Sequence, residues 1–113
     1  MSQITTHILD TSKGKPAEGV RVTLEKPGDG REWISIANGV TDADGRITDL
    51  LRTDNMLDPG HYRLTFETAS YFAAQKTGRF YPFVQIVFEI TDAAHYHIPL
   101  LLNPFGYTTY RGS

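Results

Sequence analysis

Apolar and polar residues alternate along most of this chain. Between short segments rich in glycine, proline and aspartate, every second residue is apolar. A period of two is typical of β-strands with one buried face. It predicts seven strands, at residues 4–10, 19–26, 33–40, 61–67, 84–90, 97–103 and 106–110. Strands this short and this numerous in 113 residues indicate an all-β sandwich of two sheets, in a single domain that spans residues 1–113.

One segment departs from this alternation. Residues 68–75 lack the period of two and begin with Thr68, a residue type that favours helix N-caps, so they predict one short helix. Residues 46–56 follow no clear pattern. The aromatic segment 80–83 is expected to belong to the core, although it could also line a ligand, and Trp33 is expected to be a packing residue.

The balance of charge and the residue types exclude several partners. Eleven basic and thirteen acidic residues give a net charge of −2, so the chain has no basic field for a nucleic acid. No run approaches the ~20 apolar residues that a membrane span needs, and residues 1–6 do not resemble a secretory signal. The chain has no cysteine, which excludes disulfides and thiolate zinc sites. Together these features predict a cytoplasmic protein with neither nucleic acid nor membrane as a partner.

Two histidines point away from the predicted core. In residues 4–10 the even-numbered positions form the core face, so His7 points the other way. In residues 96–102 the even-numbered positions are again apolar, so His97 also leaves the core. A leucine accompanies each histidine on this outer face, which indicates that another subunit covers it. A site between subunits is therefore expected.

The end of the chain adds polar groups to these histidines. Residues 110–113 (YRGS) follow the last strand without a linker, so they are expected to form part of a site. With His7, His97 and Arg46, Ser113 would supply what hydrolysis of an acyl or lactam carbonyl requires. A histidine can take a proton from water, and a guanidinium can offset charge on the oxyanion. The alternative is that these are ordinary, partly exposed surface residues.

The spacing of the histidines also permits a metal site. His95 and His97 project to the same face of a strand, and His7 could complete a three-histidine zinc site. No acidic residue stands at an obvious ligand spacing, and His95 lies at a strand entrance where exposure to solvent is expected. We therefore predict no metal. The chain also lacks the glycine motifs that bind nucleotide cofactors, so no cofactor is predicted.

Four segments together resemble one family. They are residues 6–10 (THILD), 41–46 (TDADGR), 80–82 (FYP) and 95–102 (HYHIPLLL) with the terminal YRGS. These segments are similar to those of the 5-hydroxyisourate hydrolases, the transthyretin-like enzymes of purine catabolism. The resemblance covers essentially the whole chain.

The resemblance implies a fold and a reaction. The implied fold is a transthyretin-like sandwich of two four-stranded antiparallel sheets with one short helix, assembled as a homotetramer with sites at the dimer–dimer interface. The implied reaction opens the ring lactam of 5-hydroxyisourate with water, giving 2-oxo-4-hydroxy-4-carboxy-5-ureidoimidazoline in urate degradation. The family's catalytic positions fall on His7, Arg46, His97 and Ser113, while Tyr110, Arg111 and Gly112 would shape the floor of the pocket with Ser113. Which histidine is the general base stays open.

Two other classes of protein share this type of sandwich. Transthyretin itself carries a hydrophobic hormone in a channel at the same interface, and a structural or adhesive domain would need no site. An apolar channel does not need two histidines, an arginine and a polar chain end. The HxH strand and the YRGS end therefore favour the enzyme.

Overall fold

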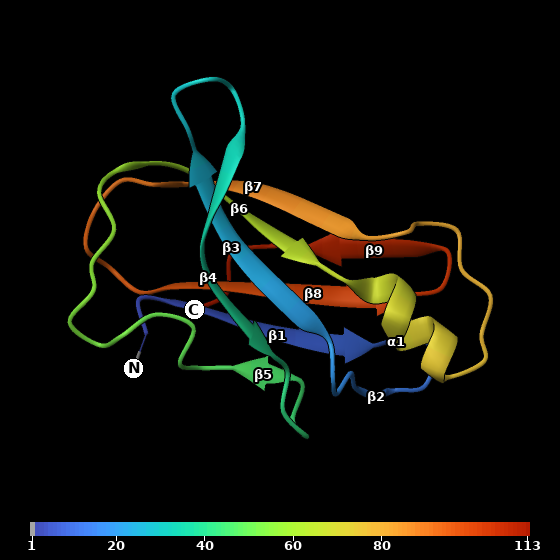
Figure 1. Ribbon diagram of the computed structural model, residues 1–113. Helices are drawn as coiled ribbons and strands as arrows, with labels where there is room; N and C mark the ends of the chain where they lie inside the picture. The colour runs from blue at the N-terminus through green and yellow to red at the C-terminus, as the bar shows by residue number, and fades with distance from the viewer. Residues whose placement is uncertain (1) are drawn as a thin grey trace.

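Two β-sheets lie face to face in the computed structural model, which describes residues 2–113 (Figure 1). One sheet has the order β2-β1-β8-β9, and a fifth strand, β5, pairs with β1 beside β2. The other sheet has the order β4-β3-β6-β7. The strands of the first sheet are β1 (Ile4–Asp10), β2 (Lys15–Pro16), β5 (Arg46–Ile47), β8 (Tyr96–Asn103) and β9 (Gly106–Thr109). Those of the second are β3 (Arg21–Pro27), β4 (Trp33–Val40), β6 (Gly60–Phe66) and β7 (Val84–Ile90).

The predicted sandwich is confirmed, but the first sheet differs from two expectations. It contains five strands rather than four, because β2 and β5 each add a two-residue strand to one edge of β1. It is also not wholly antiparallel, because β1 and β8 run in parallel over their length. Strands as short as β2 and β5 show no alternation, and the long connection between β1 and β8 allows either relative direction.

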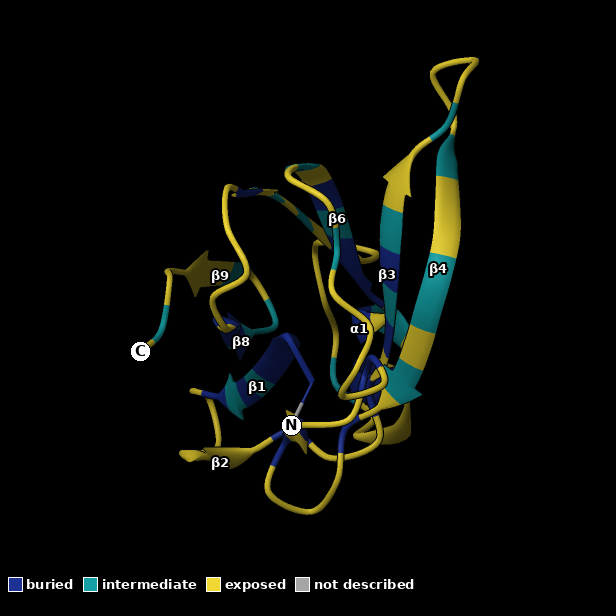
Figure 2. Cartoon of the chain, turned by 90° about the vertical axis from the view of Figure 1, so that its left-hand side faces the viewer, coloured by how far each residue is buried: buried dark blue, intermediate teal, exposed yellow. Residues whose placement is uncertain are grey.

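The core lies between the two sheets and follows the predicted alternation. In β8 the even-numbered residues are buried, while His97 and Leu101 are partly exposed. Figure 2 shows that β4, an edge strand of the second sheet, is partly or fully exposed along its length. Burial of apolar area is the main favourable contribution to this packing. The largest fully buried apolar side chains are Phe66, Ile4, Ile8, Leu24, Leu64, Ile90, Leu100, Leu102, Val20, Val22 and Val84.

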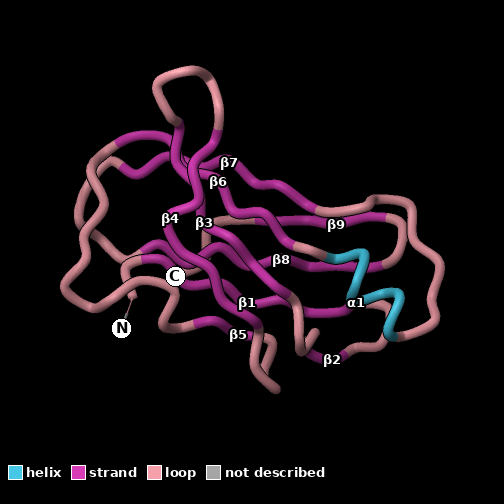
Figure 3. The backbone as a smooth tube through the Cα atoms, in the orientation of Figure 1, coloured by secondary structure: helices cyan, strands magenta, loops and turns pink. Residues whose placement is uncertain are grey.

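The predicted helix is present as α1 (Thr68–Ala74), which follows β6 and lies at one end of the sandwich (Figure 3). The prediction that Thr68 caps this helix is wrong. The N-cap position belongs to Glu67, which makes no capping hydrogen bond with its side chain. Thr68 lies inside the first turn, where its buried hydroxyl has no partner within residues 2–113. No helix in the described part of the chain is long and apolar enough to cross a membrane.

The aromatic segment 80–83 does not enter the core, contrary to expectation. Phe80 is 68% exposed and Phe83 is 45% exposed. Tyr81 bridges two exposed rings, at 4.9 Å from Phe80 and 5.5 Å from Tyr107 between ring centroids. Trp33 is half-buried on the outer face of its sheet, where the guanidinium of Arg63 lies 4.5 Å from the centroid of its ring.

Candidate active site

Strand pairing brings the predicted site residues together on the first sheet. β1 lies between β5 and β8, and it pairs with both strands around the predicted site residue His7. His7 is opposite Arg46 in the antiparallel pair with β5. Thr5 is opposite His97 in the parallel pair with β8. Residues from three distant segments of the chain therefore meet on one face, supported by regular strands.

The end of the chain returns to the same face. The backbone N–H of Gly112 donates to the carbonyl oxygen of His97 over 2.8 Å, and the two residues form an isolated antiparallel bridge. This bond holds the segment after β9 along the beginning of β8. Ser113 follows directly and reaches the cavity beside His97.

A cavity of about 180 Å³ collects these groups. Its lining includes two imidazoles, one guanidinium and several hydroxyls. The lining residues are Thr5, Thr6, Arg46, Thr48, His95, His97 and Ser113. His7 lies next to it, with its ring centroid 6.5 Å from that of His97 and the two planes inclined by 29°. The structure thus places three of the four predicted catalytic residues in one cavity and the fourth beside it.

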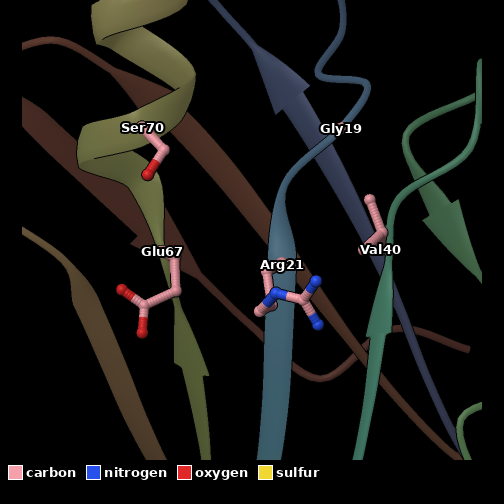
Figure 4. Close-up of a pocket in the computed structure, with 5 residues that line it drawn as sticks. All are labelled: Gly19, Arg21, Val40, Glu67 and Ser70. Atoms are coloured by element: carbon pink, nitrogen blue, oxygen red, sulfur yellow. The ribbon is translucent and has the colours of Figure 1, made fainter.

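Other hollows in the molecule are larger but lack such chemistry. One of about 450 Å³ lies where β3, β4 and the start of α1 meet. Figure 4 shows Arg21 on one side of it and Glu67 and Ser70 on the other, with Gly19 and Val40 completing the lining. None of these five lining residues carries an imidazole. The cavity lined by His95 and His97, called the histidine cavity below, therefore differs from the larger hollows in its chemical groups and not in its volume.

The environment of His97 favours its neutral form. Burial around the ring lowers the pKa of His97 below its ordinary value of 6.5. The nearby His7, His95 and Arg46 lower this pKa further, because a second positive charge would repel the imidazolium. A hydrogen bond with the backbone of Thr5 opposes these effects in part. A neutral imidazole in a partly enclosed cavity can accept a proton from water.

Thr5 is a part of the site that sequence reasoning missed. Its hydroxyl oxygen lies 2.7 Å from Nδ1 of His97 and 2.8 Å from Nε2 of His95. The available signal was its position on the same face of β1 as His7, two residues away. His95 is exposed, as expected for a strand entrance, but it is anchored through this hydroxyl. Within residues 2–113, no group of three or more histidine, cysteine or acidic residues is arranged to hold a metal ion.

The model of the family described as HIUase/Transthyretin matches residues 4–112, nearly the whole chain. The chain belongs to the HIUase/transthyretin family. A 5-hydroxyisourate hydrolase of Mus musculus is 42% identical over 99% of this chain and 96% of its own length. One of Salmonella dublin is 45% identical over 97% of this chain and 80% of its own length.

The relatives in this family also include longer proteins. The Arabidopsis thaliana protein named uric acid degradation bifunctional protein TTL is 45% identical to this chain over 97% of the chain. The match covers only 37% of the Arabidopsis protein, so the rest of that protein has no counterpart here.

Solved structures of the family show both hydrolases and transthyretins with this fold. The 5-hydroxyisourate hydrolase of Klebsiella pneumoniae superimposes with a TM-score of 0.83 at 44% identity, over 97% of this chain and 98% of that one. Sea bream transthyretin in complex with thyroxine superimposes with a TM-score of 0.90 at 34% identity, over 98% of this chain and 95% of that one. The fold of the HIUase/transthyretin family therefore does not separate the two activities, and the residues of the site must do so.

Two of the predicted pocket residues lie elsewhere in this family member. The guanidinium of Arg111 lies 4.2 Å from the centroid of the Tyr96 ring, on the side of β8 opposite to His97. Tyr110 and Arg111 line a different, mainly apolar cavity of about 170 Å³. Within one subunit, Gly112 and Ser113 are therefore the residues of the YRGS end that meet the histidine cavity.

Proposed function

We propose that this chain hydrolyses 5-hydroxyisourate in urate degradation, using water activated by His97. The activity itself is supported by relatives named 5-hydroxyisourate hydrolase, which are 42–45% identical over 97–99% of this chain. Similarity of this extent assigns the chain to the hydrolases of purine catabolism. The observation that carries the mechanism is the position of His97, whose pKa is lowered by burial, in one cavity with Arg46 and Ser113.

The proposed reaction begins with water bound beside His97. The neutral imidazole takes one proton as the water oxygen attacks the carbonyl carbon of the ring lactam. The guanidinium of Arg46 offsets the negative charge that develops on the carbonyl oxygen. When the carbon–nitrogen bond breaks, the leaving nitrogen gains a proton from His7 or from the protonated His97, and the carbonyl carbon becomes that of a carboxylic acid, which releases its proton to solvent. The product is 2-oxo-4-hydroxy-4-carboxy-5-ureidoimidazoline.

We assign different tasks to the two histidines. His7 is opposite Arg46 across the β1–β5 pair, and its ring is close to that of His97 without a direct hydrogen bond to it in the described residues. This position suits a residue that holds the substrate or protonates its leaving nitrogen. Ser113 would orient the water or an imidazole from the rim of the cavity. Gly112, with Tyr110 and Arg111 in the assembled protein, would shape the surrounding surface.

Hormone transport is the competing function, because transthyretin has the same fold. A carrier of an apolar hormone needs an apolar channel, whereas the cavity here is lined by two imidazoles, a guanidinium and hydroxyl groups. Burial of these groups against an apolar ligand would leave them without hydrogen-bond partners, at a cost in free energy. The lining therefore favours the hydrolase.

We also propose that the protein assembles as a homotetramer. Apolar side chains that would normally be buried lie exposed, notably Phe80, Phe83, Val87 and Phe105. Exposed apolar surface of this kind marks sites of protein association.

The substrate is a small purine derivative. A cytoplasmic location stays a prediction from the sequence.

The test of the proposed mechanism is the variant His97→Asn. We expect it to fold and assemble normally and to lose on the order of 10²–10⁴-fold in kcat, the usual contribution of a general base. The measurement is the decay in absorbance of freshly oxidised urate with and without protein. His61→Asn is the matched control, because His61 is exposed on the other sheet beside Glu89. A full rate in His97→Asn would overturn the mechanism, and no rate in the unmodified protein would overturn the activity.

A further inference from the structure

One buried hydroxyl connects two imidazoles at the site. Thr5 is 3% exposed, and its Oγ1 lies within hydrogen-bond distance of Nδ1 of His97 and Nε2 of His95. The parallel pairing of β1 and β8 explains this, because it sets Thr5 opposite His97. His95 precedes His97 by two residues and lies on the same side of the chain, with the ring centroids 6.3 Å apart.

The single hydrogen of the Thr5 hydroxyl links the tautomers of the two histidines. A threonine hydroxyl has a single hydrogen, so it can donate to only one of the two ring nitrogens. A neutral imidazole carries its hydrogen on one nitrogen and accepts at the other. If Thr5 donates to one ring, the nitrogen of the other ring must carry a hydrogen in order to bond to the same oxygen. The tautomer of His97 therefore depends on that of His95.

The proposed reaction selects one of the two arrangements. His97 can take a proton from water only at a nitrogen with a free lone pair, and within residues 2–113 its Nε2 has no hydrogen-bond partner. The hydrogen must then be on Nδ1, where it is donated to Oγ1 of Thr5. The Thr5 hydroxyl in turn donates to Nε2 of His95, which acts as the outer acceptor.

We infer that Thr5 is a positioning residue that holds His97 in the Nδ1–H tautomer, with His95 as the outer acceptor of the chain of hydrogen bonds. This inference rests on the proposed function, because it supplies the orienting partner that a histidine base needs. When Nε2 of His97 gains the proton from water, the Nδ1–H bond to Thr5 becomes charge-assisted and stronger. Thr5 and His95 thus stabilise the protonated base without touching the substrate's reacting atoms.

The first test replaces the hydroxyl while preserving the shape of the side chain. Thr5→Val removes the donor and acceptor, whereas Thr5→Ser retains them. In Thr5→Val we expect the ¹⁵N resonances of neutral His97 to show a mixture of tautomers, and kcat to fall about tenfold with little change in KM. Thr5→Ser should restore the Nδ1–H tautomer and most of kcat. Thr41→Val is the control, because Thr41 is equally buried and bonded to backbone groups away from the cavity.

A second pair of variants acts from the exposed end of the chain of hydrogen bonds. His95→Leu removes the acceptor and His95→Gln supplies another, and neither disturbs the core because His95 is exposed. We expect His95→Leu to lower the Nδ1–H population of His97 and His95→Gln to preserve it. This pair tests the inference even if Thr5→Val fails to fold.

Three results would overturn the inference. They are an Nε2–H tautomer of His97 in the unmodified protein, an unchanged tautomer and kcat in Thr5→Val, or equal behaviour of His95→Leu and His95→Gln. The NMR measurement does not depend on turnover. Failure of the proposed function would therefore appear as no hydrolysis by the unmodified protein, whereas failure of this inference would appear in the tautomer populations.

Discussion

The backbone of Gly112 lies directly against the imidazole of His97. A Cβ atom at Gly112 would be 2.6 Å from Cδ2 of the His97 ring and 3.3 Å from Cγ of Pro99. The N–H of Gly112 also donates to the carbonyl oxygen of His97. The absence of a side chain at this position therefore allows the chain end to pack against the ring, which fixes one wall of the cavity.

We predict that Gly112→Ala displaces His97 and lowers activity. A Cβ at 2.6 Å is closer than atoms can approach, so the ring or the chain end must move. A displacement near 1 Å at a catalytic group can reduce the rate on the order of 10²-fold. Activity assays and the ¹⁵N resonances of His97 would measure the effect. Gly78→Ala is the control, because a Cβ there meets nothing within 4 Å. Equal activity of both variants would contradict the prediction.

A bulky segment appended after Ser113 is predicted to abolish most activity. Ser113 lines the cavity, so added residues would begin inside it or force the segment from Gly112 to move. The experiment uses a fused domain that cleaves itself off and leaves Ser113 as the last residue. Hydrolysis measured before and after cleavage compares the same preparation. Normal activity before cleavage would show that Ser113 does not contribute to the site.

The pH dependence of activity should reflect the lowered pKa of His97. Burial, and secondarily the charges of His7, His95 and Arg46, keep the pKa of this imidazole below 6.5. A base must be unprotonated, so kcat/KM should decline toward acidic pH with an apparent pKa below the 6.5 of an ordinary imidazole. An NMR titration of the ring provides the direct measurement.

A companion variant tests the cause of this shift. His7→Asn removes a neighbouring positive charge and should raise the pKa of His97 toward its ordinary value, whereas His61→Asn should leave it unchanged. A pKa of His97 above 6.5 in the unmodified protein would contradict the electrostatic argument.

The outer face of the second sheet carries a pH-dependent contribution to stability. Arg63 donates to both carboxylate oxygens of Glu25, over 2.8 and 3.1 Å, and the Thr65 hydroxyl donates to the same group. The bond from Arg63 is the main cause that lowers the pKa of Glu25, against the opposing effect of burial. This contribution is present above the unfolded pKa near 4.5 and is lost as the pH falls through the lower pKa of the folded state.

Glu25→Gln is the variant that measures this contribution. We expect it to lower the free energy of unfolding at pH 7 by about 1–3 kcal/mol, with a smaller difference at acidic pH. Denaturant unfolding at several pH values provides the measurement. Glu89→Gln is the control, because its side chain is 65% exposed and its contact with His61 is long. A difference between Glu25→Gln and the unmodified protein that does not vary with pH would exclude this assignment.

Much of the fold could be predicted from local pattern. The strands at residues 4–10, 33–40 and 84–90 have the predicted bounds, and the helix differs from its prediction by one residue. The alternation also identified the outward direction of His7 and His97. Such features are local, because successive side chains on a strand must point to opposite faces.

Other features depend on pairing between distant segments. The two-residue strands β2 and β5 have no pattern of their own and exist through their bonds to β1. Alternation places Thr5 on the same face of β1 as His7, but only the register of β1 with β8 brings its hydroxyl between two imidazoles. The exposed aromatic residues of segment 80–83 likewise have a sequence typical of a core.

The chain end also combines features that local sequence predicts with features that depend on pairing between distant segments. Residues 110–113 were recognisable as a polar cluster, and their types indicated a site. The bridge between Gly112 and His97 places Arg111 on the opposite side, over Tyr96. Residue type and alternation are properties of short segments, so they can be read along the chain. The meeting of His97, Arg46 and Ser113 is a property of strand register over tens of residues, which is set by the packing of the whole sandwich.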